Sequence, residues 1–201
     1  MRCFLITFLC IFIGACIPYS DNPLTDPNSE KMDSVIYGTW FWKEEHESGY
    51  IHVGLDEESK LLRVVMLDID AVGHLDISEF SGHTSVLGNN KYLNLKWIRP
   101  ADEVPGYLFV KYTVEGESLA FSLIEFDIVE NAIKDGSLKG SIDEDKGGSP
   151  FRVTEVHVTE EQKKLQEFVV RNDKELFKEK THLYRLTLPN KSLSPTAERE
   201  G

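Results

Sequence analysis

Apolar and polar residues alternate in short runs between residues 35 and 126, a pattern that predicts β-strands. The clearest runs are 91–98, where Leu93, Leu95 and Trp97 alternate with polar residues, and the pair 107–114 and 118–126. Four further strands are expected at 35–42, 50–54, 60–67 and 75–80. This regular spacing predicts a mainly β domain, an antiparallel β-barrel or sandwich.

Between the strands at 75–80 and 91–98, we expect a loop containing Gly82, Gly88, Asn89 and Asn90. Helical signals begin only after residue 126, so two or three short helices are expected toward the C-terminus. They are indicated by three pairs of capping residues: Asp127 with Glu130, Thr159 with Gln162, and Asn172 with Glu175. Two more strands are expected at 151–158 and 181–188.

The first sixteen residues have the pattern of a secretory signal. Arg2 is their only charge, and an apolar run of about eleven residues extends from Cys3 to Ile13. This run is shorter than the ~20 apolar residues of a membrane-spanning helix. The last four residues, Ile13-Gly14-Ala15-Cys16, resemble a bacterial lipobox, in which an aliphatic and two small residues precede a cysteine that is lipidated.

The resemblance to bacterial lipoproteins implies that residues 1–15 are a signal peptide and that Cys16 carries the lipid. The protein would then be held at the membrane by its acylated N-terminus. An ordinary secretory signal and an uncleaved anchor are the alternatives. Because Ile17 rather than Asp follows the cysteine, the enterobacterial sorting rule implies the outer membrane, with the domain facing the periplasm. The inner membrane stays open, since the rule does not hold in all bacteria.

Two segments rich in proline and polar residues flank the alternating region. Residues 16–33 contain three prolines and are expected to form a flexible tether between the lipid and the domain. Residues 189–201 are expected to form a disordered tail. The folded domain would therefore span residues 34–188, a length that suits one core.

Composition narrows the choice of partners. The chain has 34 acidic and 22 basic residues and a net charge of −12. Nucleic acid is a poor partner, because no basic surface is expected to neutralise its phosphates. The three cysteines are Cys3, Cys10 and Cys16, so removal of the signal leaves one cysteine and no disulfide.

Gly38-Thr39-Trp40 in the first strand resembles the lipocalin signature, Gly-x-Trp. In lipocalins the glycine lets the chain turn into the barrel, the tryptophan plugs the closed end, and a late arginine covers the indole. The resemblance implies that Arg185 or Arg171 makes this cation–π contact. The two helices, the strand at 151–158 and the missing disulfide depart from the lipocalin pattern.

A lipocalin-like barrel implies an interior that binds a small apolar ligand, in a cavity lined by Trp40, Trp97, Phe109 and Phe121. A filled interior, in a structural or interaction protein, is the alternative. The sequence contains no nucleophile elbow and no phosphate-binding loop, and its six histidines lack the spacing of a zinc site. It indicates no catalytic residue, cofactor or particular protein partner, and a non-enzymatic role is the expectation, with an enzyme left open.

One stretch partly matches a calcium-binding loop. Asp68, Asp70, Asp76 and Glu79 occupy ligand positions of an EF-hand, and Gly73 occupies its sharp turn. Val72, however, stands where an oxygen ligand is required, and the preceding residues predict a strand. A polar turn with surface carboxylates is therefore the competing interpretation.

Overall fold

The structure is a computed structural model, and it describes residues 17–187 except 28, 30, 45–46, 100–104 and 145–153. The expected signal peptide, Cys16 and the expected tail at 189–201 lie outside the described residues. No helix of the described part is long and apolar enough to cross a membrane.

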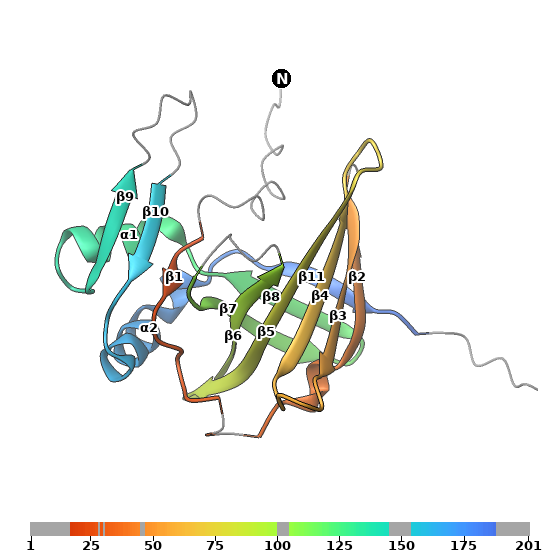
Figure 1. Ribbon diagram of the computed structural model, residues 1–201, viewed down its shortest axis with the longest axis horizontal. Coiled ribbons are helices and arrows are strands. Elements are labelled where there is room, and N and C mark those ends of the chain that lie inside the picture. The colour runs from red at the N-terminus through yellow and green to blue at the C-terminus, as the bar shows by residue number, and fades with distance from the viewer. Residues whose placement is uncertain are drawn as a thin grey trace, which may run out of the picture.

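Eight antiparallel strands close into a barrel (Figure 1). In order around the barrel they are β11 (Thr181–Arg185), β2 (Gly38–Lys43), β3 (Ser48–Leu55), β4 (Leu62–Ile69), β5 (Leu75–Leu87), β6 (Asn90–Arg99), β7 (Leu108–Glu115) and β8 (Ser118–Leu123). The last strand of the chain closes the sheet, because Leu183 pairs with Leu119 on β8 and Tyr184 pairs with Phe41 on β2. The predicted mainly β, antiparallel fold is confirmed, as a barrel and not a sandwich.

The expected loop at Gly82 is wrong, because β5 continues through this residue to Leu87. Gly82 lies opposite Leu95 within the sheet, and a Cβ atom there would come within 2.3 Å of the Asn94 carbonyl oxygen. The glycine therefore permits a close approach of backbone inside a strand and does not mark a turn. The turn itself is short and uses Gly88, whose φ of 62° favours glycine.

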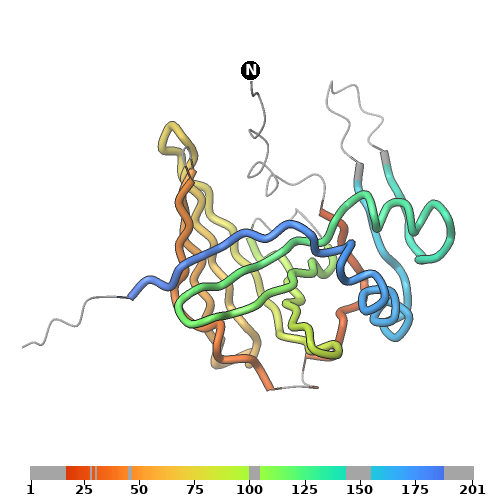
Figure 2. The backbone as a smooth tube through the Cα atoms, turned by 180° about the vertical axis from the view of Figure 1, so that it is seen from behind, coloured from red at the N-terminus to blue at the C-terminus, as the bar shows by residue number. Residues whose placement is uncertain are grey.

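A smaller unit packs against the outside of the barrel. It contains a sheet of β1 (Tyr19–Ser20), β10 (Thr154–Val158) and β9 (Gly140–Glu144), together with helices α1 (Phe126–Lys134) and α2 (Gln162–Leu176). Figure 2 shows this unit beside the barrel from behind. The third expected helix is part of α2, because the Asn172 side chain donates to the Phe168 carbonyl within the helix and does not cap a new one.

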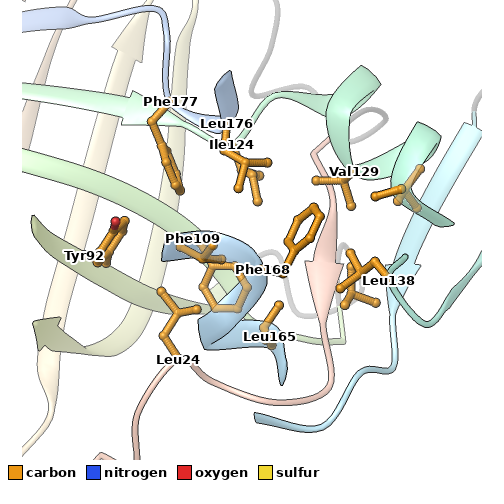
Figure 3. Packing of buried hydrophobic residues seen from close by; sticks show 14 residues of the cluster. Leu24, Tyr92, Phe109, Ile124, Val129, Leu138, Leu165, Phe168, Leu176 and Phe177 are labelled. Atoms are coloured by element: carbon orange, nitrogen blue, oxygen red, sulfur yellow. The ribbon is translucent and has the colours of Figure 1, made fainter. Parts of the chain in front are cut away.

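The unit has its own apolar core, which includes residues on the outer face of the barrel. Tyr92 and Phe109 project outward from β6 and β7 and are buried with Leu165 and Phe168 of α2 (Figure 3). The Tyr92 hydroxyl donates to Asp173 at 2.6 Å, and the Lys111 ammonium donates to the same carboxylate at 2.5 Å. Burial raises the pKa of the Tyr92 hydroxyl, and the hydrogen bond to Asp173 and its charge raise the pKa further. Helix α2 is thus fixed to the barrel wall by packing and by a shared carboxylate.

Residues 17–27 differ from the flexible tether that their prolines predict. Leu24 is fully buried, and its N–H donates to Asn94 Oδ1 at 2.6 Å. His83 Nε2 donates to the Thr25 carbonyl at 2.7 Å, while the Thr25 and Ser85 hydroxyls share a hydrogen bond. These polar side chains project outward from β5 and β6, and the N-terminal segment satisfies them. The segment is therefore part of the fold.

Candidate ligand-binding cavity

The barrel interior contains a cavity of about 60 Å³. Side chains from all eight strands contribute to the core around it. Only apolar or aromatic residues line the cavity: Ile17, Ile36, Ile51, Val53, Val64, Met66, Phe80, Leu93, Leu95, Leu108, Val110, Tyr112, Leu119, Phe121, Leu123 and Leu183. The alternation seen in the sequence explains this lining, because every second residue of each strand points inward.

The volume of the cavity limits what it can hold. It exceeds the ~10–15 Å³ that one water molecule requires, but water needs polar partners that this lining lacks. It is smaller than the ~150 Å³ cavity that takes up benzene in an engineered protein. Without movement of side chains, the barrel has room for the end of an alkyl chain and not for a whole lipid.

The four residues predicted to line a ligand cavity have different positions. Phe121 lines it. Trp40 is fully buried at one end of the barrel, and Trp97 packs against Phe80 at a ring-centroid distance of 4.2 Å. Phe109 belongs to the outer core beneath α2, because it pairs with the outward-facing Asn94 and so has the opposite orientation to Val110. Its assignment to the cavity is wrong.

Trp40 forms the floor of one end of the barrel, which we call the closed end. Its indole N–H donates to the Ile36 carbonyl at 2.8 Å, within a short 3-10 helix, η2 (Ser34–Ile36), that precedes β2. The Arg185 guanidinium lies 4.1 Å from the centre of the Trp40 ring. Of the two arginines expected to cover the indole, Arg185 does so, whereas Arg171 is exposed on α2.

Arg185 also fixes the backbone of η2. Its guanidinium donates to the Tyr37 carbonyl at 2.6 Å and to the Val35 carbonyl at 2.9 Å. Gly38 makes room for it, since a Cβ atom at this position would lie 2.7 Å from Arg185 Nη1. The φ of Gly38 is 126°, a backbone conformation that other residues rarely adopt. The glycine, the indole and the arginine therefore depend on one another.

Asp33 completes the closed end, and no pattern in the sequence indicated this role. Its carboxylate accepts hydrogen bonds from Lys91 at 2.7 Å, from the Tyr112 hydroxyl at 3.0 Å and from the Val35 N–H at 3.2 Å. Burial alone would raise the pKa of Asp33, but these hydrogen bonds outweigh it and lower the pKa. Asp33 thus links η2 to β6 and β7.

The opposite end of the barrel is marked by Ile17, and we call it the Ile17 end. Ile17 lines the cavity together with Leu108, the first residue of β7, and Leu123, the last residue of β8. Because neighbouring strands are antiparallel, the turn between β4 and β5 also lies at this end. The start of the described chain therefore lies at the same end of the barrel as this turn (Figure 1). An apolar residue directly after Cys16 was the available signal in the sequence.

The inner wall near the Ile17 end is more polar than the cavity. Asp68 and Asp76 pair across β4 and β5 on the inward-facing side. Burial raises the pKa of Asp68, and the charges of Asp76 and Asp70 raise it further. Within the described chain, the indole nitrogens of Trp42 and Trp97 are buried without a hydrogen-bond partner. This end of the barrel therefore contains groups that the protein itself leaves poorly satisfied.

The residues of the proposed calcium loop are spread over a β-hairpin. Asp70 accepts hydrogen bonds from the Val72 and His74 N–H groups within the turn. Glu79 points outward and pairs with Arg63 at 2.5 Å, away from the inward-facing Asp68 and Asp76. Among the described residues, no group of three His, Cys, Asp or Glu side chains is placed to hold a metal ion. The hairpin supports the competing interpretation, a polar turn.

Comparison with known proteins gives no relative for this arrangement. No family model matches the chain, and neither a curated protein nor a solved structure matches it. The structure itself shows a closed eight-stranded barrel and the contact among Gly38, Trp40 and Arg185 at its closed end.

Proposed function

We propose that this protein is a lipid-anchored bacterial envelope protein with a lipocalin-like barrel that takes up a small apolar ligand, such as the end of an alkyl chain. The observation that carries this proposal is the cavity, whose lining is wholly apolar. Empty cavities of this kind stay dry and favour apolar guests. The lipobox-like residues that end at Cys16 support the anchor, and outer-membrane attachment facing the periplasm follows from Ile17 as an expectation.

The cavity is tested by filling it. Val110 lines the cavity on β7, and Val110→Phe should occupy much of the free space at a cost of about 1–3 kcal/mol in stability. The matched control is Val170→Phe, at an exposed position on α2. The acylated full chain is titrated with octanoate as the probe, because its alkyl end suits a cavity of about 60 Å³; isothermal titration calorimetry measures binding, and circular dichroism checks that each variant is folded.

We expect the wild type and Val170→Phe to bind the probe and Val110→Phe to lose binding while it remains folded. A wild type that binds no probe would support the filled interior of a structural protein. Equal binding by both variants would place the probe outside the barrel and contradict the proposal.

The anchor is tested separately. Cys16→Ser should abolish incorporation of radioactive palmitate and leave an uncleaved precursor, because lipid attachment precedes cleavage at a lipobox. Unchanged processing of this variant would refute lipidation and favour an ordinary secretory signal.

A further inference from the structure

The hydrophobic pattern of β4 reverses along its length. In its first half, Leu62 and Val64 are buried inside the barrel and Arg63 points outward to Glu79. In its second half, Asp68 points inward, and Leu67 and Ile69 lie on the outer face. A strand that only closed a barrel in water would keep apolar residues inside throughout.

Strand β5 reverses in the same way. Phe80 points into the barrel, whereas Leu75 and Ile77 lie on the outer face opposite Ile69 and Leu67. Leu75 is 52% exposed, Ile77 is 55% exposed, and Val72 in the turn is 76% exposed. On β3, the exposed Tyr50 pairs with Leu67 and extends the surface sideways. We call these residues the hairpin patch: Tyr50, Leu67, Ile69, Val72, Leu75 and Ile77.

The position of the patch indicates what covers it. The turn between β4 and β5 lies at the Ile17 end of the barrel, and the described chain begins at the same end, on the side of the small sheet (Figure 1). Residues 17–27 are packed onto the fold, so little chain separates Cys16 from this end of the barrel. Consecutive Cα atoms are only 3.80 Å apart. A lipid on Cys16 therefore brings a bilayer surface to the end that carries the patch.

The chemistry of the patch suits a bilayer surface. Clustered apolar side chains at a loop tip can be buried among acyl chains, and a tyrosine ring, with one apolar and one polar end, suits the headgroup level. The Asp70 carboxylate is engaged by two N–H groups of its own turn. Asp68 and Asp76 are on the inward side of the hairpin and not in the patch.

We propose that the hairpin patch inserts into the surface of the bilayer that holds the acylated Cys16. This inference rests on the proposed acylation. Together, the lipid and the patch hold the Ile17 end of the barrel against the membrane. An alkyl chain then has a short path from the bilayer to the apolar cavity, past Ile17, Leu108 and Leu123. The net charge of −12 means that apolar burial, and not attraction to anionic headgroups, supplies the contact.

The test measures which residues touch lipid. Ile77→Cys and, as a matched control, Val86→Cys are labelled with the environment-sensitive fluorophore NBD in the acylated full chain. Both positions are exposed apolar residues of β5, at opposite ends of the strand. The labelled proteins are reconstituted into phosphatidylcholine vesicles with and without brominated acyl chains. Acylation blocks the thiol of Cys16, so the label reacts only with the introduced cysteine.

We expect a blue shift and loss of most NBD fluorescence to brominated lipid at residue 77, and neither effect at residue 86. Leu75→Cys should behave like Ile77→Cys. Vesicle-bound protein that shows no quenching at residue 77, or equal quenching at both positions, overturns the inference. A blue shift that depends on protein concentration and not on brominated lipid assigns the patch to a second copy and also overturns it. Failure of acylation is recognised independently, because the protein then does not float with the vesicles.

Discussion

The two ends of the barrel differ in how well their polar groups are hydrogen-bonded and in how far their apolar side chains are exposed. At the closed end, Arg185, Asp33 and the Trp40 indole each have hydrogen-bond partners, and Gly38 beside them has a φ of 126°, which other residues rarely adopt. At the Ile17 end, two indole nitrogens have no partner in the described chain, and apolar side chains of the hairpin patch are exposed. The same strands run through both ends.

The two ends of the barrel differ in what their residues contribute to the stability of the fold. Satisfied polar groups and fitted side chains stabilise a native state, whereas buried unpaired donors and exposed apolar residues cost stability. Proteins tolerate such costs where a surface has another task. The closed end therefore supports the fold, and the Ile17 end is where contact with a ligand or a membrane is expected.

The largest effect is expected when the same residue type is removed from each end. Arg185→Ala deletes a cation–π contact and two charged hydrogen bonds, and we expect unfolding to become easier by about 3 kcal/mol. Arg99→Ala, near the Ile17 end, removes an exposed ion pair with Glu79 and should cost only ~0–1 kcal/mol. Urea unfolding followed by tryptophan fluorescence measures both. Similar losses for the two variants would remove the distinction between the ends.

Part of the closed end could be predicted from the sequence, because Gly38-Thr39-Trp40 resembles the lipocalin signature. That resemblance implied an arginine on the Trp40 indole and left Arg171 and Arg185 open, whereas nothing in the sequence indicated Asp33. Strand alternation indicated an antiparallel barrel or sandwich, because inward and outward positions follow a period of two. The alternation did not fix the pairing partners, so a barrel and a sandwich remained equivalent.

The N-terminal segment could not be predicted, because its contacts join residues far apart in the chain. Pro18, Pro23 and Pro27 indicated a tether, yet the segment is held by Asn94 and His83 on the outside of the barrel. Those two residues occupy outward positions and so predicted contact with water. Only tertiary packing shows that a polar residue on a strand faces another segment.

Glycine substitutions should show a smaller difference between the ends. Gly38→Ala introduces a side chain at a φ of 126° and 2.7 Å from the Arg185 guanidinium, so we expect a loss of about 2–3 kcal/mol. Gly73→Ala, in the turn of the hairpin, also has a positive φ, but its Cβ would meet nothing within 4 Å. Strain alone should then cost about 1 kcal/mol. Thermal unfolding measures the melting temperature of both variants. A lower melting temperature for Gly73→Ala than for Gly38→Ala would contradict the expected difference between the ends.

The smallest effects should have opposite signs at the two ends. Hydrogen bonds lower the pKa of Asp33 despite burial, so its charge stabilises the fold, and Asp33→Asn should cost about 1 kcal/mol at neutral pH. Burial and neighbouring carboxylates raise the pKa of Asp68, so its charge destabilises the fold, and Asp68→Asn should increase stability. Urea unfolding at pH 7 compares both variants with the wild type.

The dependence on pH follows from the same two shifts. A carboxyl whose pKa is lowered by folding contributes stability above its unfolded value of ~3.9, and this contribution is lost as pH falls through the lower folded value. The charged Asp68 carboxylate destabilises the fold fully at pH values above its raised folded pKa. This destabilisation disappears as pH falls toward the unfolded pKa of ~3.9. The gain from Asp68→Asn should therefore vanish in acid before the loss from Asp33→Asn does. If the free energies of unfolding of both variants approached that of the wild type over the same pH range, the two carboxyl groups would not have opposite pKa shifts.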